Sequence, residues 1–480
     1  MSERELLART AGIAADYLES LDTRAVAPAR TYSEMHSALD GPVPDGPCDP
    51  VDLIEEMAAA LEPGLTAMGS GRFFGFVIGG ALPSTIAADW LVSTWDQNTG
   101  LAEPTPATCA LEAVAGRWVI ELLGLPAHSS FAFVTGCQMA HVTCLAAARH
   151  AVYARAGWDL PANGLAGAVP LRVVVGGKRH VTLTRALRLL GIGEAQEVVL
   201  PVDGEGRMDV ATLATALDSD APTIVCAQAG EVNTGAVDDL ATIVDVAHSA
   251  DAWVHVDGAF GLWAAASPSL RHHLEGHDQA DSWATDAHKW LNVPYDCGIA
   301  LCAHPEHHAA AMEYAAPYLA VAGSAAIRDP MGYSPEFSRR ARSAPVWAAI
   351  RQLGRSGVTE LVERCCAHAR RFAERIVELP GCEVVNEVVL NQVLFRFEDD
   401  ETTTRTLAAV QASGEAWMSG TVWGDRAAMR LSVSNWRTTE ADIDRTVAAF
   451  AAARGEVYSS ERPRQSSATA GSAKHRPSPT

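Results

Sequence analysis

The stretch Ala252-Trp253-Val254-His255-Val256-Asp257-Gly258-Ala259 contains an apolar run that ends in a carboxylate and a glycine. A short run of this kind predicts a buried strand, and it is the last of several that alternate with helical patterns. Near-continuous apolar strands separated by helices indicate an α/β fold with a mostly parallel sheet covered on both faces. Such sheets bind ligands at the carboxyl ends of their strands, where Asp257 falls. The elements predicted before this strand are the strands 171–175, 197–200 and 223–227 and the helices 183–190, 210–217 and 240–247.

The chain has only three lysines, and one of them lies in an unusual setting. Lys289 belongs to Thr285-Asp286-Ala287-His288-Lys289-Trp290-Leu291, a largely apolar segment with a histidine beside the lysine. Arginine can replace lysine on a solvated surface, but it cannot form a Schiff base. A desolvated lysine lowers its pKa from about 10.4 and becomes a nucleophile towards aldehydes. Lys289 is therefore the first candidate for chemistry.

Size and composition describe a globular protein with a large core. A chain of 480 residues predicts two domains, or one large and one small, and 48% apolar with 20% charged residues leaves ample core. The net charge of −21 would repel a phosphate backbone, which argues against nucleic acid as a partner. No uncharged apolar run is long enough to span a membrane, and the charged start Met1–Glu5 does not resemble a signal peptide. We therefore expect a cytoplasmic protein without membrane contact.

The cysteines and histidines give no strong metal signal. Ten cysteines in so long a chain do not form a disulfide scaffold, and no pair has the spacing of a zinc site. His273 and His277 could share one helix face, but their polar surroundings favour a solvated face over a metal site. Gly191-Ile192-Gly193 begins a dinucleotide-type pattern, yet Gln196 occupies the third glycine position, which indicates a helix that ends on glycine. No metal is expected.

The chain divides into segments by composition. A long, poorly periodic stretch contains Tyr314, Tyr318 and Tyr333, and a stretch of this length is often a lid or a site loop. Short strands are predicted near Val384 and Val393, followed by a last strand at 429–433. The predicted segments are an N-terminal helical arm (1–60), a large domain (61–305), a loop or connector (306–342), a smaller α+β C-terminal domain (343–455) and a disordered Ser/Pro/Arg-rich tail (456–480).

Several residues fit the needs of an aldehyde cofactor with a pyridine ring and a phosphate. Lys289 can form the imine, and Asp257 can hold the ring nitrogen protonated, although a turn or N-cap aspartate would also explain its position. The run 133–141 predicts a strand, a glycine and a helix, whose N-terminus around Gly136 would attract the phosphate. His180 can stack on the ring. Each residue alone is weak evidence, but their order and spacing together predict a cofactor site.

With these motifs the chain resembles the pyridoxal-phosphate-dependent group II amino acid decarboxylases, which include the aromatic-amino-acid and glutamate decarboxylases. The resemblance rests on His255-Val256-Asp257-Gly258-Ala259-Phe260, on His288-Lys289-Trp290-Leu291 and on the spacing between Asp257 and Lys289. It extends over roughly residues 50–455. It implies an aspartate-aminotransferase-like fold (fold type I of these enzymes), with a mostly parallel large domain and a smaller α+β domain.

The resemblance also implies roles for individual residues. Lys289 would form the internal aldimine, Asp257 would pair with the pyridinium and His180 would stack on the ring. The implied cofactor-binding set is Gly136, Cys137, Gln138, His180, Asn233, Asp257, Ala259, Asp286, His288 and Lys289. The family further implies a homodimer with a shared active site. This chain departs from the common pattern in the phosphate loop, which lacks serine, in Glu231-Val232 before Asn233, and in the loop that would carry a protonating tyrosine.

Three hypotheses follow for the reaction. Decarboxylation of an L-amino acid to the amine and carbon dioxide is the first, and transamination or oxidative deamination to an aldehyde on the same cofactor is the second. A silent homologue with a binding role is the third, and the intact Lys289, Asp257 and His180 argue against it. Arg430 could anchor a substrate carboxylate or form an ordinary salt bridge. Phe73, Phe74, Phe76 and Trp95 suggest an aromatic or branched substrate, although core packing is the slightly favoured explanation.

Overall fold

A seven-stranded sheet forms the centre of the large domain. This computed structural model describes residues 2–217, 220–312 and 327–461. Four neighbouring strand pairs are parallel, and β7 runs antiparallel to both of its neighbours, β1 and β6. The prediction of a mostly parallel sheet is confirmed, while the antiparallel β7 was not anticipated. In spatial order the strands are β1 (Ser130–Val134), β7 (Gly298–Cys302), β6 (Ser282–Asp286), β5 (Trp253–Asp257), β4 (Thr223–Gln228), β2 (Arg172–Gly176) and β3 (Glu197–Leu200).

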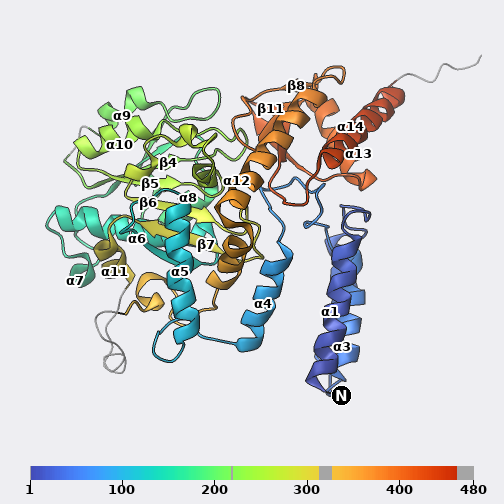
Figure 1. Cartoon of the computed structure of the whole chain (residues 1–480). Helices are drawn as coiled ribbons and strands as arrows, with labels where there is room; N and C mark the ends of the chain where they lie inside the picture. Colours follow the sequence, from blue (N-terminus) through green and yellow to red (C-terminus); the bar gives the residue numbers. More distant parts are fainter. Residues whose placement is uncertain (1, 218–219, 313–326, 462–480) are drawn as a thin grey trace, which may run out of the picture.

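Both faces of this sheet are buried, because alternate residues of each strand enter different core clusters. Val174, Val225 and Val254 join the larger cluster, and their strand neighbours Val173 and Ile224 join the second one. This is the two-residue period of a strand covered on both sides. α10 packs in the first cluster, whereas α6 and α8 pack in the second (Figure 1). The helices around this sheet are α5 (Pro106–Leu122), α6 (Cys137–Arg155), α7 (Leu160–Asn163), α8 (Val181–Leu189), α9 (Val210–Ala216), α10 (Leu240–Ser249) and α11 (Pro305–Met312).

A second, antiparallel sheet forms the smaller domain predicted from the sequence. Its spatial order is β10 (Ser419–Trp423), β11 (Arg426–Ser432), β9 (Gln392–Arg396) and β8 (Glu383–Val384). The strands near Val384 and Val393 are confirmed, and β10 was missed. Its helices are α12 (Ser343–Ile376), α13 (Asp400–Ser413) and α14 (Glu440–Glu461). α14 continues to Glu461, past residue 456, where the tail was predicted to begin. The other domain boundaries stay predictions.

The remaining segments are helical. α1 (Glu3–Ser20), α2 (Tyr32–Leu39) and α3 (Pro50–Leu61) form the predicted arm, and Figure 1 shows α1 and α3 standing apart from the large domain. α4 (Pro83–Trp95) lies against α12. The stretch 306–342 was predicted as a loop, but α11 occupies its beginning, and Tyr314 and Tyr318 lie outside the described residues. Six 3-10 turns complete the described part: Glu62–Gly64, Glu194–Gln196, Gly261–Ala266, Arg271–Leu274, His277–Gln279 and Pro330–Tyr333. Within the same residues, no helix is both long and apolar enough to span a membrane.

Candidate active site

Lys289 follows β6 and pairs with the carboxylate at the end of that strand. Its Nζ atom lies 3.0 Å from Oδ2 of Asp286, and the side chain remains 20% exposed. Burial, the largest single effect, lowers the pKa of Lys289. The charge and hydrogen bond of Asp286, together with the charges of Cys137 and Asp257, outweigh burial, and the pKa lies above its usual value. The expectation that desolvation alone lowers this pKa is therefore wrong, because a carboxylate stabilises the ammonium form.

The backbone of Lys289 is held by a close approach of another segment. A Cβ atom added to Gly79 would lie 1.7 Å from the carbonyl oxygen of Lys289. Shortly before this contact, Phe76 and Val77 both have positive φ angles, which are costly for side chains of this size. The loop before α4 therefore packs directly against the backbone of Lys289.

The N-terminus of α6 lies beside the same carboxylate. Gly136 is the N-cap residue and offers no side-chain cap, and the N–H of Cys137 donates to Oδ1 of Asp286 at 2.6 Å. A Cβ atom on Gly136 would approach Cε1 of His288 at 3.4 Å, and one on Gly298 would overlap the backbone of Gly136. Two glycines thus bring β7, His288 and the start of α6 together. Free N–H groups at a helix N-terminus are suited to a phosphate.

His288 is fixed in one tautomer by its neighbours. Its Nδ1 atom accepts a hydrogen bond from the N–H of Cys297 at 3.0 Å, so the ring proton lies on Nε2, 3.4 Å from Oδ1 of Asp286. The ring stacks on Tyr295 with centroids 4.3 Å apart. Burial lowers the pKa of His288, against the attraction of Asp286. His288 is therefore a neutral donor next to the N-terminus of α6.

Asp257 ends β5 and meets a histidine that the sequence did not single out. Oδ2 of Asp257 lies 3.4 Å from Nε2 of His141, and Oδ1 accepts the N–H of Ala259 at 3.2 Å. Burial raises the pKa of Asp257, but the attraction and hydrogen bond of His141, followed by the charges of His180 and Lys289, bring the pKa below its usual range. The carboxylate is ionised at neutral pH.

A chain of buried hydrogen bonds supports His141 from behind. Nδ1 of His141 lies 2.9 Å from Nε2 of His255, whose Nδ1 lies 2.9 Å from Oγ of Ser282. Trp253 donates its indole N–H to the same Oγ at 2.9 Å. Burial lowers the pKa of His255 to about 3, so this ring is neutral. Since an indole nitrogen can only donate, a continuous direction of donation leads from Trp253 through Ser282, His255 and His141 to Asp257.

His180 caps α8 and faces the same charges. Its Nδ1 accepts the N–H of Thr182 at 3.4 Å and lies 2.7 Å from the hydroxyl of Thr182, so the ring proton lies on Nε2. Burial lowers the pKa of His180, and Asp257 opposes that change. Because β2 and β5 are parallel strands of one sheet, both residues lie at its carboxyl edge. The predicted stacking on a cofactor ring stays a prediction.

Asn233 and Ala259 occupy different environments. The amide of Asn233 donates to Oε1 of Glu231 at 2.9 Å and accepts from the hydroxyl of Thr421 at 3.0 Å, which ties this turn to β10 of the small domain. Its predicted cofactor contact stays a prediction, since both ends of the amide have other partners. Ala259 links the two carboxylate loops, because its carbonyl accepts the N–H of Asp286 at 2.9 Å.

Arg430 is buried on β11, and its guanidinium is sparsely bonded. Among the described residues its one recorded hydrogen bond goes to Oγ of Ser419 at 3.4 Å, and its Nε has no partner. Burial lowers its pKa, while the charge of Glu231 raises it. No ion pair involves Arg430 within the described ranges, which argues against the ordinary salt bridge considered from the sequence.

The aromatic residues considered as substrate walls separate into two groups. Phe73 and Phe74 are core residues, as the packing interpretation predicted. Phe76 and Trp95 are more than half exposed, and the ring of Phe76 lies 5.4 Å from that of Trp417. Tyr333 is described as well, and Arg328 lies over its ring at 4.4 Å. His273 and His277 lie on separate 3-10 turns, so they do not share a helix face.

These residues fit pyridoxal phosphate. The site combines a lysine that is mostly buried, the ionised carboxylate of Asp257, the neutral ring of His180 and a helix N-terminus without a side-chain cap. The one feature that opposes a phosphate dianion is Asp286, which already accepts the N–H of Cys137. Lys289 and His288 lie next to that carboxylate and offset its charge.

The sequence contained a signal for His141 that was not used. Cys137 and His141 stand four residues apart on α6, so both side chains lie on one face of the helix, and that face meets Asp257. His255 likewise belongs to the quoted strand, but strand alternation alone does not show that it contacts His141. The contacts of His141 and His255 follow only from the packing of α6 on β5.

Comparison with known proteins agrees with this geometry. The family profile of the pyridoxal-dependent decarboxylase conserved domain matches residues 33–398. The chain therefore belongs to the pyridoxal-dependent decarboxylases, and it is a carboxy-lyase that uses pyridoxal phosphate to decarboxylate an amino acid. The expected family, fold, reaction and cofactor are thereby confirmed.

Individual relatives cover nearly the whole chain. Tryptophan decarboxylase 1 of Oryza sativa subsp. japonica is 28% identical over 467 residues, which cover 90% of each protein. Aromatic-L-amino-acid decarboxylase of Bacillus atrophaeus is 25% identical and covers 92% of this chain and 93% of the relative. The crystal structure of Oryza sativa TDC with PLP and tryptamine superimposes with a TM-score of 0.88 at 26% identity, over 95% of this chain and 98% of that chain.

Proposed function

We propose that this decarboxylase acts on an L-amino acid with an aromatic side chain, with Lys289 and Asp257 as its catalytic residues. The observation that carries the proposal is the joint position of the two residues at the carboxyl ends of neighbouring parallel strands, β6 and β5. Lys289 would carry the cofactor and Asp257 would face its ring nitrogen. The cofactor supplies an electron sink for the carbanion left when carbon dioxide departs.

The protein residues would hold charges and protons in place. Asp257, ionised and supported by His141, would keep a proton on the ring nitrogen, which would preserve the electron-withdrawing form of the ring. His288 and the N-terminus of α6, from Gly136 to Gln138, would bind the phosphate. Arg430, with its sparsely bonded guanidinium, would orient the substrate carboxylate, since a buried cation without an ion pair favours an anionic partner.

The aromatic substrate class rests on two independent supports. The relatives named above act, by their names, on tryptophan and on aromatic L-amino acids. In this chain the exposed ring of Phe76 lies against Trp417, on the loop whose Gly79 contacts the backbone of Lys289. An exposed aromatic ring on the loop that contacts the backbone of Lys289 favours an apolar, planar side chain.

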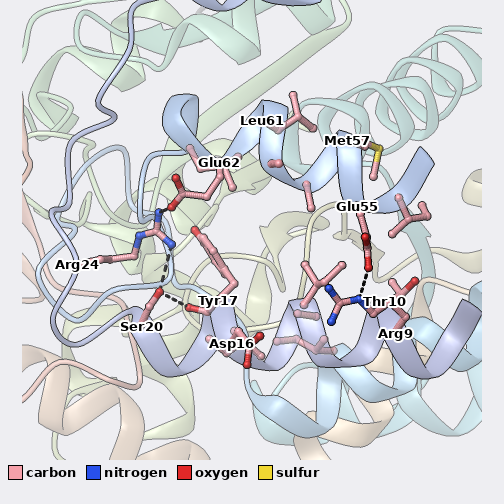
Figure 2. A pocket seen from close by; sticks show the side chains of 18 of the residues that line it. Arg9, Thr10, Asp16, Tyr17, Ser20, Arg24, Glu55, Met57, Leu61 and Glu62 are labelled. Carbon is pink, nitrogen blue, oxygen red and sulfur yellow. Dashed lines mark hydrogen bonds and ion pairs between the residues drawn. The ribbon is translucent and has the colours of Figure 1, made fainter. Parts of the chain in front are cut away.

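A homodimer is also part of the proposal. α1 has no buried residue, and it forms with α3 a groove of about 940 Å³ (Figure 2). An ion pair between Arg9 and Glu55 joins the two helices across it, and a second pair, between Arg24 and Glu62, joins the segments that follow them. Exposed apolar residues on or beside this arm would be covered by a second subunit in the cytoplasm: Leu7, Leu53, Met57, Leu65, Trp90, Leu91 and Trp95.

One assay tests the proposed function. The purified protein is incubated with pyridoxal phosphate and the common amino acids in one pool, and the products are identified by mass spectrometry. An aromatic amine is the expected product, and Lys289→Ala should abolish its formation. Lys178→Ala is the control and should retain it, because the ammonium of Lys178 lies over the ring of Trp423. An aldehyde or keto acid as the main product, or an aliphatic amine, would overturn the proposal. Light scattering of the same sample should give the mass of a dimer.

A further inference from the structure

Three side chains of different chemistry converge on one point of the active site. Sγ of Cys137 lies 3.5 Å from Nε2 of His141 and 3.9 Å from Oδ1 of Asp257. Nε2 of His141 lies 3.4 Å from Oδ2, the other oxygen of the same carboxylate, so the three side chains form a triangle. All three ligand atoms lie within 4.8 Å of one another, and all three residues are buried. Neither decarboxylation nor cofactor binding requires a thiol at this position.

The triangle has the dimensions of a tetrahedral zinc site. With Zn–S near about 2.3 Å and Zn–N or Zn–O near about 2.0–2.1 Å, the ligand atoms of a tetrahedral zinc ion are about 3.3–3.6 Å apart. The distances of 3.5 Å and 3.4 Å from Nε2 of His141 fall in this range. Since Cys137 and His141 face different oxygens of Asp257, the carboxylate has to rotate to present one oxygen to the ion. A thiolate, an imidazole and a carboxylate leave the fourth position open.

The surroundings of His141 also suit a metal ligand. Its Nδ1 contacts Nε2 of His255 at 2.9 Å, so the ring orientation is fixed from behind while Nε2 faces Cys137 and Asp257. A second partner of this kind is typical of metal-binding histidines. Cys137 and Asp257 each keep 6% of their surface exposed, and His141 is fully buried behind them.

We propose that Cys137, His141 and Asp257 bind a zinc ion when the cofactor is absent, and that zinc and pyridoxal phosphate exclude each other. The exclusion rests on the proposed role of Asp257, because one carboxylate cannot hold both the pyridine nitrogen and the ion. On zinc binding the thiol of Cys137 releases its proton to solvent. His141 and His255 both change from the Nε2–H to the Nδ1–H tautomer, so that His141 donates to His255, His255 donates to Ser282, and Nε2 of His141 is free for the ion. A mild regulatory consequence follows: zinc slows the reloading of enzyme that has lost its cofactor.

The first experiment measures zinc binding to the full chain, stripped of cofactor, in competition with a coloured chelator. One equivalent of zinc should bind, and Cys137→Ser should weaken that affinity by more than about 100-fold, since removal of a second-shell partner alone costs about 10–100-fold. Cys144→Ser is the matched control, because Cys144 lies on the same helix and its thiol contacts backbone carbonyls instead. Equal affinity in both variants would overturn the site.

The second experiment tests exclusion. Cobalt in place of zinc should give the near-ultraviolet band of a cobalt–thiolate bond, and added pyridoxal phosphate should remove that band as its own visible absorbance grows. Persistence of the band in fully loaded enzyme would overturn the exclusion. Cobalt could also bind to the partly buried pair His150 and His307, whose Nδ1 atoms lie 3.1 Å apart. His307→Asn removes that second site. Since both readouts are independent of amine formation, failure of the proposed function would leave this test intact.

Discussion

The Nε2 atom of His141 lies 3.4 Å from the carboxylate of Asp257, although the two residues belong to different elements, α6 and β5. The contact makes α6, whose N-terminus is proposed to bind the phosphate, also the support of the carboxylate of Asp257. Because His255 contacts the other nitrogen of His141, the orientation of Asp257 depends on His141 and, behind it, on His255 and Ser282.

Replacing His141 tests this dependence. His141→Leu removes the donor to Asp257, so the carboxylate loses its main counterweight to burial and its pKa should rise. We expect kcat to fall by about 10–100-fold, as for other second-shell partners. The pH dependence of the bound cofactor's absorbance should shift with it. His141→Gln, which retains a donor, should recover part of both effects, and equal losses in the two variants would assign His141 a packing role only.

Asp286 controls the charge of Lys289. Asp286→Asn retains an acceptor for the N–H of Cys137 but removes the carboxylate 3.0 Å from Nζ. The pKa of Lys289 should fall, because burial would then act without its main opponent. More of the amine is uncharged at neutral pH, so cofactor capture should be faster, about tenfold for each unit of pKa change. Stopped-flow absorbance at several pH values measures this rate. Slower capture would instead assign Asp286 a direct role in holding the cofactor.

The sequence predicted the sheet well because each strand carries its own signal. The strand 197–200 matches β3 at both ends, and the strand 223–227 differs from β4 by one residue. A buried parallel strand is a continuous apolar run, and its ends are marked by turn residues. The antiparallel β7 could not be assigned a direction in this way, since apolar runs do not record the orientation of their neighbours.

The candidate site was predicted where a motif is local. Lys289, His288 and Asp286 lie within one short segment, and the structure brings all three together. No role was predicted for His141, and two alternatives were left for Arg430, because the roles of both residues depend on contacts between elements distant in sequence. The elevated pKa of Lys289 was missed for the same reason: the sign of a pKa shift depends on the balance between burial and a neighbouring charge.

Arg430 should determine substrate affinity. Arg430→Gln removes the cation proposed to orient the carboxylate, and hydrogen bonds to charged groups contribute about 1.5–3 kcal/mol. The KM for the amino acid should therefore rise by about tenfold or more, with cofactor affinity unchanged. Arg396→Gln is the control, since Arg396 pairs with Glu383 on the small sheet. A KM equal to that of the control would show that Arg430 serves folding only.

Acid should destabilise the protein already at pH values above those at which carboxylates titrate. His308 is fully buried between Ser130 and the carbonyl of Tyr333, and burial lowers its pKa to about 3. The unfolded histidine titrates near about 6.5, so below that pH the unfolded chain binds a proton that the folded chain excludes. The free energy of unfolding should fall by up to about 1.4 kcal/mol per pH unit for this group as the pH falls from about 6.5 towards 3. Thermal unfolding of His308→Gln should show a flatter pH dependence, and the exposed His128→Gln should not.

Gly79 should tolerate no side chain, because its backbone lies directly against Lys289. In Gly79→Ala the new Cβ would lie 1.7 Å from the carbonyl oxygen of Lys289, so one of the two segments must move. Overpacking of this kind costs about 1–3 kcal/mol or more, and here the displaced backbone carries the reactive amine. We expect a lower Tm and, at temperatures where the variant is folded, weaker cofactor binding. Gly193→Ala is the control, since a Cβ there meets nothing within 4 Å. A variant at Gly79 with normal cofactor affinity would show that the loop before α4 can move without disturbing Lys289.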